Sequence, residues 1–373
     1  MRRVRAYIGL GANVGDARRT LTEAVAALGG LPGARLRGVS RLFRTSPVGV
    51  ADQPDFLNAV VALDVPAGSD PPSGSIDLLI ALKDLERSFG RQRRGRWGPR
   101  ELDLDLLLFG RHRIAVERPP EATPASAAID PGAAARLLEV PHPSMADRLF
   151  VLAPLADLAP GLVPPGWHET VKTAAVRRLP IEGAGAVRPI GWWSDFDRAW
   201  VGPSGGAVTI EEPGPADAED AARAHSASAE AAYRGIAPPD PNGLARRTRT
   251  WLEILANPGP DNRSFVARDA GRIVGVLNIG RFRDTEAVAL RILYVHPAWW
   301  GSDAGQLLMD RALQELARDH GEAVLTVLTA NARARRFYER NGWEARETVI
   351  EPHFGDRPTE VTRYRRALRG SRP

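Results

Sequence analysis

Residues 93–105 read Arg-Arg-Gly-Arg-Trp-Gly-Pro-Arg-Glu-Leu-Asp-Leu-Asp. From residue 102 onward leucine alternates with aspartate, and such alternation predicts a strand with one buried face. Asp103 and Asp105 then lie on the same face of the strand, opposite the leucines. Paired carboxylates suit Mg²⁺, which takes one or two protein carboxylates and completes its coordination with water and substrate phosphates. Because the nearby arginines can bind phosphate in a bidentate manner, the run predicts a site for phosphoryl-type transfer.

An isolated Asp-x-Asp pair is more simply interpreted as a solvated acidic face on an edge strand that follows a basic loop. The longer pattern Arg-Trp-Gly-Pro-Arg-x-x-Asp-x-Asp, residues 96–105, is more specific. It resembles the signature of the 6-hydroxymethyl-7,8-dihydropterin pyrophosphokinase (HPPK) family of folate biosynthesis. Four further segments resemble this family in the same order, namely residues 7–16, 41–48, 52–58 and 140–150. The resemblance covers about residues 4–170, a normal size for one domain.

The resemblance implies a role for each matching position. Asp103 and Asp105 would hold two Mg²⁺ ions between the ATP phosphates and the pterin hydroxymethyl group, with Arg100 beside them. A loop that closes over the triphosphate would carry Arg93, Arg94 and Arg96. The residues lining the ATP side would be Glu86, Trp97, Leu106, His142 and Arg148. The pterin would be bound by Thr45, Pro47, Val48, Phe56, Asn58 and Phe150, with the two phenylalanine rings stacked on it.

The reaction implied by the resemblance moves the β,γ-pyrophosphoryl group of ATP onto the hydroxymethyl oxygen and releases AMP. Bound Mg²⁺ would neutralise the charge that develops between nucleophile and leaving group. No strong base stands at the expected place, so we expect the metal at Asp105 to lower the pKa of the alcohol.

Length and composition indicate what kind of protein contains this site. With 373 residues, 43% hydrophobic and 25% charged, the chain is expected to form two globular domains. It contains no Cys, which excludes disulfides and thiolate–metal sites. Because no apolar stretch approaches about 18 residues and the N-terminus has no apolar signal region, we expect a cytoplasmic protein without a membrane span.

The charge gives little indication of a macromolecular partner. The 50 basic residues include only two lysines, Lys83 and Lys172, and Arg, Ala, Gly and Pro are abundant together, which suggests GC-rich coding. The net charge of +5 is therefore weak evidence for nucleic-acid binding, and we expect small-molecule partners only.

The first half predicts a ferredoxin-like α+β sandwich over residues 1–175. Its expected strands are 4–10, 34–44, 57–65 and 102–109, and its expected helices are 16–29 and 75–89. The Gly- and Pro-containing segment 176–206 has the composition of a linker. The aromatic group from Trp192 to Trp200 inside it is interpreted as a strap between domains.

The second half, residues 207–373, predicts a separate α/β domain. Its expected strands are 208–211, 264–269, 272–281, 287–295, 323–328, 344–351 and 359–368, and its expected helices are 216–233, 243–256, 304–319 and 332–341. This order resembles the GNAT fold of acetyl-CoA-dependent N-acetyltransferases. The match is carried by residues 293–305, Leu-Tyr-Val-His-Pro-Ala-Trp-Trp-Gly-Ser-Asp-Ala-Gly, and 331–343, Asn-Ala-Arg-Ala-Arg-Arg-Phe-Tyr-Glu-Arg-Asn-Gly-Trp.

This second resemblance implies acetyl-CoA with its pyrophosphate at a helix N-terminus, where backbone N–H groups and the helix dipole attract anions. Tyr338 would protonate the departing thiolate. The cofactor would be bound by Val295, Gly301, Ala304, Gly305 and Asn331. Asp303 stands where the family usually has glycine, so it would place a carboxylate near the phosphates without glycine's backbone freedom.

Three interpretations of the whole chain follow. The first is a bifunctional enzyme, HPPK joined to an acetyltransferase acting on an unknown amine. The second is an HPPK whose GNAT domain only binds CoA or serves as a scaffold. The third is a nucleotide-binding regulatory protein in which neither chemistry is intact. Release of AMP separates the first two from the third, and binding of acetyl-CoA separates the first from the second.

Overall fold

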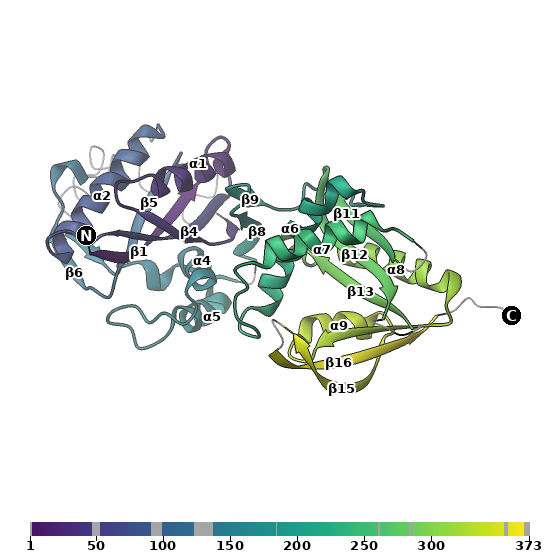
Figure 1. The fold of residues 1–373 in the computed structure, drawn as a ribbon. Helices are drawn as coiled ribbons and strands as arrows, with labels where there is room; N and C mark the ends of the chain where they lie inside the picture. The colour runs from purple at the N-terminus through teal and green to yellow at the C-terminus, as the bar shows by residue number, and fades with distance from the viewer. Residues whose placement is uncertain are drawn as a thin grey trace. The chain divides into compact units, whose positions relative to one another are not determined.

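The structure is a computed structural model that describes residues 2–46, 53–90, 99–122, 137–183, 185–259, 262–282, 285, 287–353 and 357–368. The chain divides into two compact units, Met1–Gly202 and Pro203–Pro373. Within the described residues, each unit contains its own seven-stranded sheet (Figure 1). The boundary between the units falls inside the segment that was predicted to be a linker.

The N-terminal unit begins with a β-α-β-β-α-β arrangement. The elements are β1 (Arg3–Ala12), α1 (Ala17–Gly29), β2 (Arg35–Val39), β3 (Leu42–Thr45), β4 (Phe56–Pro66), α2 (Pro71–Ser88) and β5 (Asp103–Phe109). The strand order is β5-β1-β4-β3, β2 also pairs with β4, and all of these pairs are antiparallel. This is the ferredoxin-like topology that the sequence predicted.

Two element boundaries differ from the prediction. The strand expected at 34–44 is divided into β2 and β3, and between them Ser40 exchanges hydrogen bonds of 2.9 Å with the Val60 backbone through its own N–H and its hydroxyl. Helix α2 starts at Pro71, four residues before the expected start at 75. Asp70 caps it by accepting from the Ser73 N–H at 2.8 Å, and proline suits a first turn because the N–H it lacks is not needed there.

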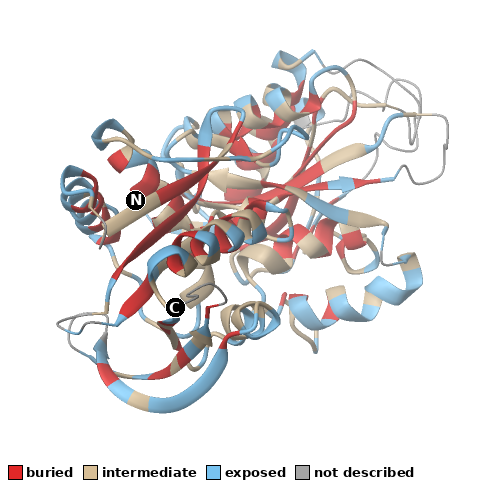
Figure 2. Cartoon of the chain, turned by 90° about the vertical axis from the view of Figure 1, so that its right-hand side faces the viewer, coloured by how far each residue is buried: buried red, intermediate tan, exposed pale blue. Residues whose placement is uncertain are grey.

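The sheet of the N-terminal unit is covered on both faces. One core contains Leu10, Leu104 and the inner sides of α1 and α2, whereas a second core contains Val60, Leu107 and two later helices. These later elements are β6 (Ile114–Glu117), β7 (Leu137–Val140), α4 (Leu149–Leu158) and α5 (Val171–Glu182), with β6 paired to β7. In the chain as a whole, strands are largely buried and the outer faces of many helices are exposed (Figure 2).

The linker predicted at 176–206 is wrong for most of its length. Helix α5 continues to Glu182, and strands β8 (Val187–Ser194) and β9 (Ala199–Val201) extend the N-terminal sheet beyond β3. Trp200 is 4% exposed, and its indole N–H donates to the Ser40 carbonyl at 2.8 Å. The aromatic group is therefore part of the first unit. Its glycines allow close packing, since a β-carbon on Gly202 would lie 2.7 Å from the Ile190 carbonyl oxygen.

The C-terminal unit follows the predicted order of elements closely. Its strands are β10 (Thr209–Glu211), β11 (Asn262–Asp269), β12 (Arg272–Arg281), β13 (Val288–Val295), β14 (Glu322–Leu328), β15 (Glu344–His353) and β16 (Arg357–Ala367). Its helices are α6 (Ala218–Tyr233), α7 (Gly243–Ala256), α8 (Ala304–Asp319) and α9 (Ala332–Arg340). The strand order is β10-β11-β12-β13-β14-β16-β15, in which the β13–β14 pair is parallel and the other pairs are antiparallel.

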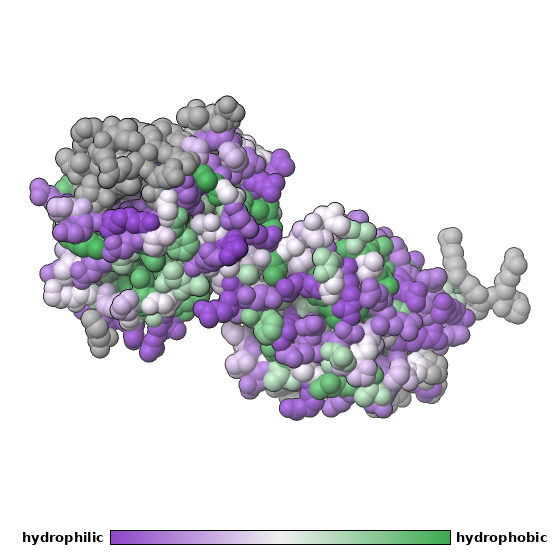
Figure 3. Space-filling view, turned by 90° about the horizontal axis from the view of Figure 1, so that it is seen from above, coloured by the Kyte–Doolittle hydropathy of each residue, from purple (hydrophilic) through white to green (hydrophobic). Residues whose placement is uncertain are grey.

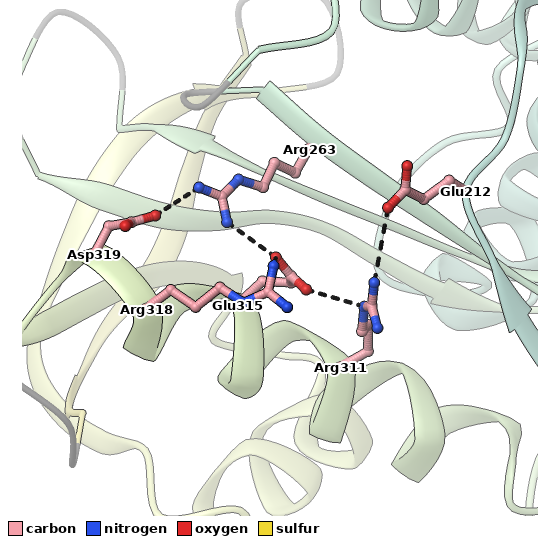
Figure 4. Close-up of polar contacts among 6 residues, drawn as sticks. All are labelled: Glu212, Arg263, Arg311, Glu315, Arg318 and Asp319. Carbon is pink, nitrogen blue, oxygen red and sulfur yellow. Dashed lines mark hydrogen bonds and ion pairs between the residues drawn. The ribbon is translucent and has the colours of Figure 1, made fainter.

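Helix α8 is held against the sheet by a charged network around Glu315, which is 3% exposed (Figure 4). The Glu315 carboxylate pairs with Arg263 of β11 at 2.9 Å, with Arg318 at 2.8 Å and with Arg311 at 3.2 Å. Arg263 also pairs with Asp319 at 2.6 Å. Because a buried carboxylate is costly unless paired, these contacts fix the position of α8 and hence of its N-terminus.

The surface has an ordinary mixture of side chains. On the face drawn in Figure 3, hydrophilic residues predominate and hydrophobic ones lie scattered among them, as on most protein surfaces. Among the described helices, none has both the length and the apolar character needed to cross a membrane.

Candidate functional sites

The two carboxylates of β5 lie on one face of the N-terminal sheet, as predicted. Leu102, Leu104 and Leu106 are buried in the core beneath α1 and α2, whereas Asp103 and Asp105 are only partly buried. Asp103 is paired in register with Gly11 of β1, and Asp105 with Gly9. Since glycine has no side chain, neighbouring side chains come close above both positions, with Leu107 carbons 3.5 Å from a β-carbon placed on Gly9.

Gly11 also connects the carboxylates to the predicted pterin residues. Its partner on the other side is Asn58 of β4, so that Asn58, Gly11 and Asp103 form one row across three strands. A β-carbon on Gly11 would lie 3.1 Å from Asn58 Oδ1 and 3.9 Å from the Asp103 β-carbon. Asn58 Nδ2 donates to the Thr45 hydroxyl at 2.7 Å. The structure therefore brings Thr45, Asn58 and Asp103 together.

The two predicted stacking rings lie on the same side of this sheet. Phe56 is two residues before Asn58 on β4 and so shares its face. Phe150 lies in the first turn of α4, packed against the core that α4 forms with β4 and β5. The Arg148 guanidinium carbon lies 5.7 Å from the centre of the Phe150 ring.

Arg100 lies beside the carboxylates and forms an ion pair with Asp103. Its backbone is held by Asn13, because the Arg100 N–H donates to Asn13 Oδ1 at 2.8 Å and its carbonyl accepts from the Asn13 N–H at 3.0 Å. Asn13 Nδ2 donates in turn to Gln53 at 3.2 Å and to the Pro54 carbonyl at 3.1 Å. Sequence reasoning did not single out Asn13, although a polar residue directly after a glycine-rich strand end was a usable signal.

His142 lies near the same charged side chains. Burial lowers the pKa of His142, and Arg148 and Arg118 lower it further, whereas the carboxylates of Asp105 and Asp103 oppose the shift. Its backbone N–H donates to the Leu107 carbonyl at 2.9 Å, and Nδ1 accepts from the Ser144 N–H at 3.3 Å. His142 is therefore a neutral imidazole near the carboxylates, on the side that the resemblance gave to ATP.

Two residues expected to line the ATP side are placed differently. The Leu106 side chain is 3% exposed and belongs to the core, so only its backbone can face a ligand. Glu86 is 2% exposed and accepts from the Leu104 N–H at 2.8 Å and from Lys83 Nζ at 2.6 Å. Lys83 Nζ also donates to the Leu104 carbonyl at 2.9 Å. The Lys83–Glu86 pair thus clamps the backbone N–H and carbonyl of Leu104, the residue between the two aspartates.

Six predicted residues fall outside the described part of the chain. They are Pro47, Val48, Arg93, Arg94, Arg96 and Trp97.

The C-terminal unit contains a cavity of about 1370 Å³ where its sheet opens. Strands β13 and β14 pair in register at Ala289 and Val324. Beyond that point, residues of both strands form opposite walls of the cavity. Drug-sized ligands occupy roughly 300–1,000 Å³, so this volume has room for a cofactor together with a second substrate.

Most of the predicted cofactor residues line this cavity. Val295, Gly301, Gly305 and Asn331 are on its wall, whereas Ala304 is fully buried and does not line it. Gly301 has a φ of 89°, so the left-handed conformation falls on a glycine, and Asp303 has ordinary helical angles at the N-terminus of α8. Asp303 therefore does not need the backbone freedom of a glycine.

An arginine marks the same end of the cavity. The Arg333 guanidinium carbon lies 3.4 Å from the centre of the Trp300 ring, and partial burial lowers the pKa of Arg333 to about 10. The Trp300 indole N–H donates to the Val295 carbonyl at 2.7 Å, which fixes the ring on which the guanidinium stacks. Sequence reasoning passed over Arg333, because arginines are frequent throughout this chain.

Tyr338 lines the cavity beside two further tyrosines. Burial raises the pKa of Tyr338, and the neighbouring Tyr294 raises it further, so the phenol stays protonated. The hydroxyls of Tyr294 and Tyr233 are 2.6 Å apart. The His225 ring stacks on Tyr294 with centroids 4.1 Å apart. Tyr294 was quoted within a motif, but its place beside Tyr338 depends on tertiary structure.

Comparison with known proteins gives a family match for each of the two units. The family model "7,8-dihydro-6-hydroxymethylpterin-pyrophosphokinase (HPPK)" matches residues 7–160, and the model "Acetyltransferase (GNAT) domain" matches residues 260–345. The 2-amino-4-hydroxy-6-hydroxymethyldihydropteridine pyrophosphokinase of Pseudomonas aeruginosa is 42% identical over 180 residues, which is 48% of this chain and 94% of the relative. The Bacillus subtilis protein of the same name is 40% identical over 153 residues, 41% of this chain and 77% of the relative.

Among solved structures, the PaiA N-acetyltransferase of Thermoplasma acidophilum in complex with coenzyme A is 17% identical. It aligns with a TM-score of 0.35 over 43% of this chain and 99% of its own. The fold defines a two-unit protein, a ferredoxin-like sandwich followed by a second unit in which residues 260–345 match the GNAT model. The chain belongs to the HPPK family through its N-terminal unit.

Proposed function

We propose that the N-terminal unit transfers the pyrophosphoryl group of ATP to 6-hydroxymethyl-7,8-dihydropterin in folate biosynthesis, and that it requires Mg²⁺. The observation that supports this proposal is the row of Asn58, Gly11 and Asp103, in which an amide and a carboxylate lie on one face of the sheet. The relatives that share this unit carry the name of that enzyme.

The residues present fit a magnesium site. Asp103 and Asp105 are partly exposed on the same face, and two carboxylates are enough when phosphates and water complete the shell. No cluster of three His, Asp or Glu side chains occurs among the described residues, which suits Mg²⁺ better than a site built entirely from protein ligands. When bound there, the metal would supply charge neutralisation for the phosphates.

The chain's own residues would position the two substrates and neutralise the phosphate charge. Arg100, held by Asn13, keeps a guanidinium beside Asp103 and within reach of a phosphate oxygen. Asn58 uses its Nδ2 on Thr45, which leaves Oδ1, directed over Gly11, to accept from the polar edge of the pterin. His142, being neutral, can accept or donate a hydrogen bond on the nucleotide side without adding charge.

The test is AMP release by the full-length protein with ATP, Mg²⁺ and the pterin, measured with and without excess chelator. We expect AMP and the pterin pyrophosphate in equal amounts, and none of either after chelation. Formation of ADP instead of AMP, or turnover that survives chelation, would refute the proposal.

For the C-terminal unit we propose transfer of the acetyl group of acetyl-CoA to an amine. The supporting observation is that one cavity has both the glycine turn before α8 and the Tyr338 phenol on its wall. The α8 N-terminus suits the pyrophosphate, and the protonated phenol suits the departing thiolate. Calorimetry of the full-length protein with acetyl-CoA tests this proposal, and the absence of heat at millimolar cofactor would favour a scaffolding module.

A further inference from the structure

The feature that carries a further inference is Arg247 of α7. It is 9% exposed and lies on the wall of the C-terminal cavity. Its Nη1 donates to the Ser226 hydroxyl at a long 3.4 Å. In the described part of the chain, no carboxylate lies within ion-pair distance of this guanidinium, although a guanidinium offers five donors and is costly to bury without an anion.

The neighbouring acid does not compensate this charge directly. Asp240 forms its ion pair with Arg246 at 2.5 Å, and that hydrogen bond is the main reason why the pKa of Asp240 is lowered. Arg247 contributes only a weaker electrostatic effect on Asp240. The Asp240 carboxylate therefore lies near two adjacent guanidiniums, and the buried guanidinium of Arg247 makes no direct contact with it.

Apart from Arg246 and Asp240, the polar groups considered around Arg247 are neutral. Burial, followed by the charges of Arg247 and Arg246, lowers the pKa of His225 to about 3, so the imidazole is uncharged at neutral pH. The Tyr233 and Tyr294 hydroxyls bond to each other. This part of the cavity thus combines an uncompensated positive charge with uncharged polar groups, as expected for a site that receives an anion from solution.

Arg247 is distinct from the end of the cavity suited to the CoA phosphates. That end is formed by the turn before α8 and by Arg333 on α9, whereas Arg247 belongs to α7, which packs beside α6 (Figure 1). Arg247, Tyr294 and Tyr338 line the same cavity, and Arg247 comes from a different helix than the groups suited to the CoA phosphates. Arg247 is therefore available to the acceptor.

We infer that the acceptor amine carries an oxyanion, a carboxylate or a phosphate, which Arg247 binds. The inference rests on the proposed acetyl transfer. In that step the amine nitrogen attacks the thioester carbon, the C–N bond forms and the C–S bond breaks. The nitrogen loses its proton to solvent water, the sulfur leaves as a thiolate that takes a proton from Tyr338, and Tyr338 is reprotonated from solvent.

The test uses the full-length protein, acetyl-CoA and matched amines, with release of the CoA thiol as the readout. The carboxylate arm compares phenylalanine with phenylalaninamide, and the phosphate arm compares O-phosphoethanolamine with ethanolamine. We expect the oxyanion member of at least one pair to have a kcat/KM at least about tenfold higher than its neutral partner. The arm that responds identifies the anion.

Variants connect the preference to the residue. Arg247→Gln should abolish the preference, Arg247→Lys should retain part of it because the charge remains, and Arg249→Gln, an exposed arginine on the same helix, should change nothing. Calorimetry with acetyl-CoA on each variant shows that the unit is folded.

The outcomes separate the two proposals. If acetyl-CoA binds but neutral amines are used as well as their oxyanion partners, or if no oxyanion amine accelerates thiol release, the inference is overturned while cofactor binding stands. Retention of the full preference in Arg247→Gln would also overturn it. If acetyl-CoA itself does not bind, the acetyl-transfer proposal fails first.

Discussion

Replacing Lys83 with Met tests the clamp beneath the paired aspartates. β5 is the terminal strand in its sheet, so the Leu104 N–H and carbonyl are satisfied by Glu86 and Lys83 instead of by a neighbouring strand. Lys83→Met removes the cation from a carboxylate that is 2% exposed and removes the donor to the Leu104 carbonyl. Breaking a buried pair on one side costs about 3–5 kcal/mol, because the remaining charge is left without compensation.

The magnitude converts into a measurable shift. For a unit of this size, 1 kcal/mol corresponds to roughly 2–4 °C in Tm, so the variant should melt about 6–20 °C lower. Differential scanning calorimetry of the full-length protein resolves the transition if the N-terminal unit is identified by its response to ATP and Mg²⁺. Lys172→Met, which replaces the one other lysine of the chain, at an exposed position, is the matched control and should leave that transition unchanged.

A double replacement sharpens the test. Lys83→Met combined with Glu86→Leu removes both charges but leaves the Leu104 N–H and carbonyl unpaired at about 1–3 kcal/mol each, so the total cost of about 2–6 kcal/mol should be similar to that of the single variant. Because the clamp fixes the backbone between Asp103 and Asp105, both variants should also need more Mg²⁺ for half-maximal AMP release. A loss below about 1 kcal/mol in Lys83→Met would contradict this reasoning, since it is the range of exposed ion pairs.

Three further variants test other contacts. Gly11→Ala places a methyl group 3.1 Å from Asn58 Oδ1, and we expect the KM for the pterin to rise about tenfold with the KM for ATP unchanged; Gly9→Ala, whose methyl would lie 3.5 Å from a Leu107 carbon, is the tolerated control. Below pH 6.5 His225 is protonated in the unfolded chain but not in the folded chain, where its pKa is about 3. The free energy of unfolding therefore decreases as pH falls, by about 2.7 kcal/mol at pH 4.5. In urea titrations, His225→Asn should remove this pH dependence. Glu315→Gln should lower the C-terminal Tm by the equivalent of about 1.5–3 kcal/mol, and equal stability of this variant and the wild type would show that the network is not stabilising.

Local patterns predicted the elements well. The alternation of leucine and aspartate placed Asp103 and Asp105 on one face of β5, and the helix-periodic segments of the C-terminal unit lie where they were expected. Such patterns depend on residues close in sequence, so they can be recognised without the tertiary fold. The wrong prediction of a linker at 176–206 has a physical cause. Glycine is frequent in linkers, but it also occurs where backbones pack closely, as at Gly202, and composition does not distinguish the two cases.

Groups defined by distant partners could not be predicted in this way. Glu86 matched a family position on the ATP side, but its burial results from α2 covering the edge of β5. Arg247 is one of many arginines in the sequence, and only the fold shows that it is buried on a cavity wall. Asn13 likewise becomes meaningful through Arg100, which lies 87 positions away in sequence.

The most direct test of the account is the binding of a divalent cation by the β5 carboxylates. Mn²⁺ can replace Mg²⁺ in a titration followed by electron paramagnetic resonance, with the full-length protein and a non-hydrolysable ATP analogue. We predict that Asp103→Asn and Asp105→Asn each lose Mn²⁺ affinity at least about tenfold and lose AMP release, while Asp84→Asn, an exposed carboxylate on α2, behaves as the wild type. Wild-type Mn²⁺ binding and AMP release in either β5 variant would contradict the account.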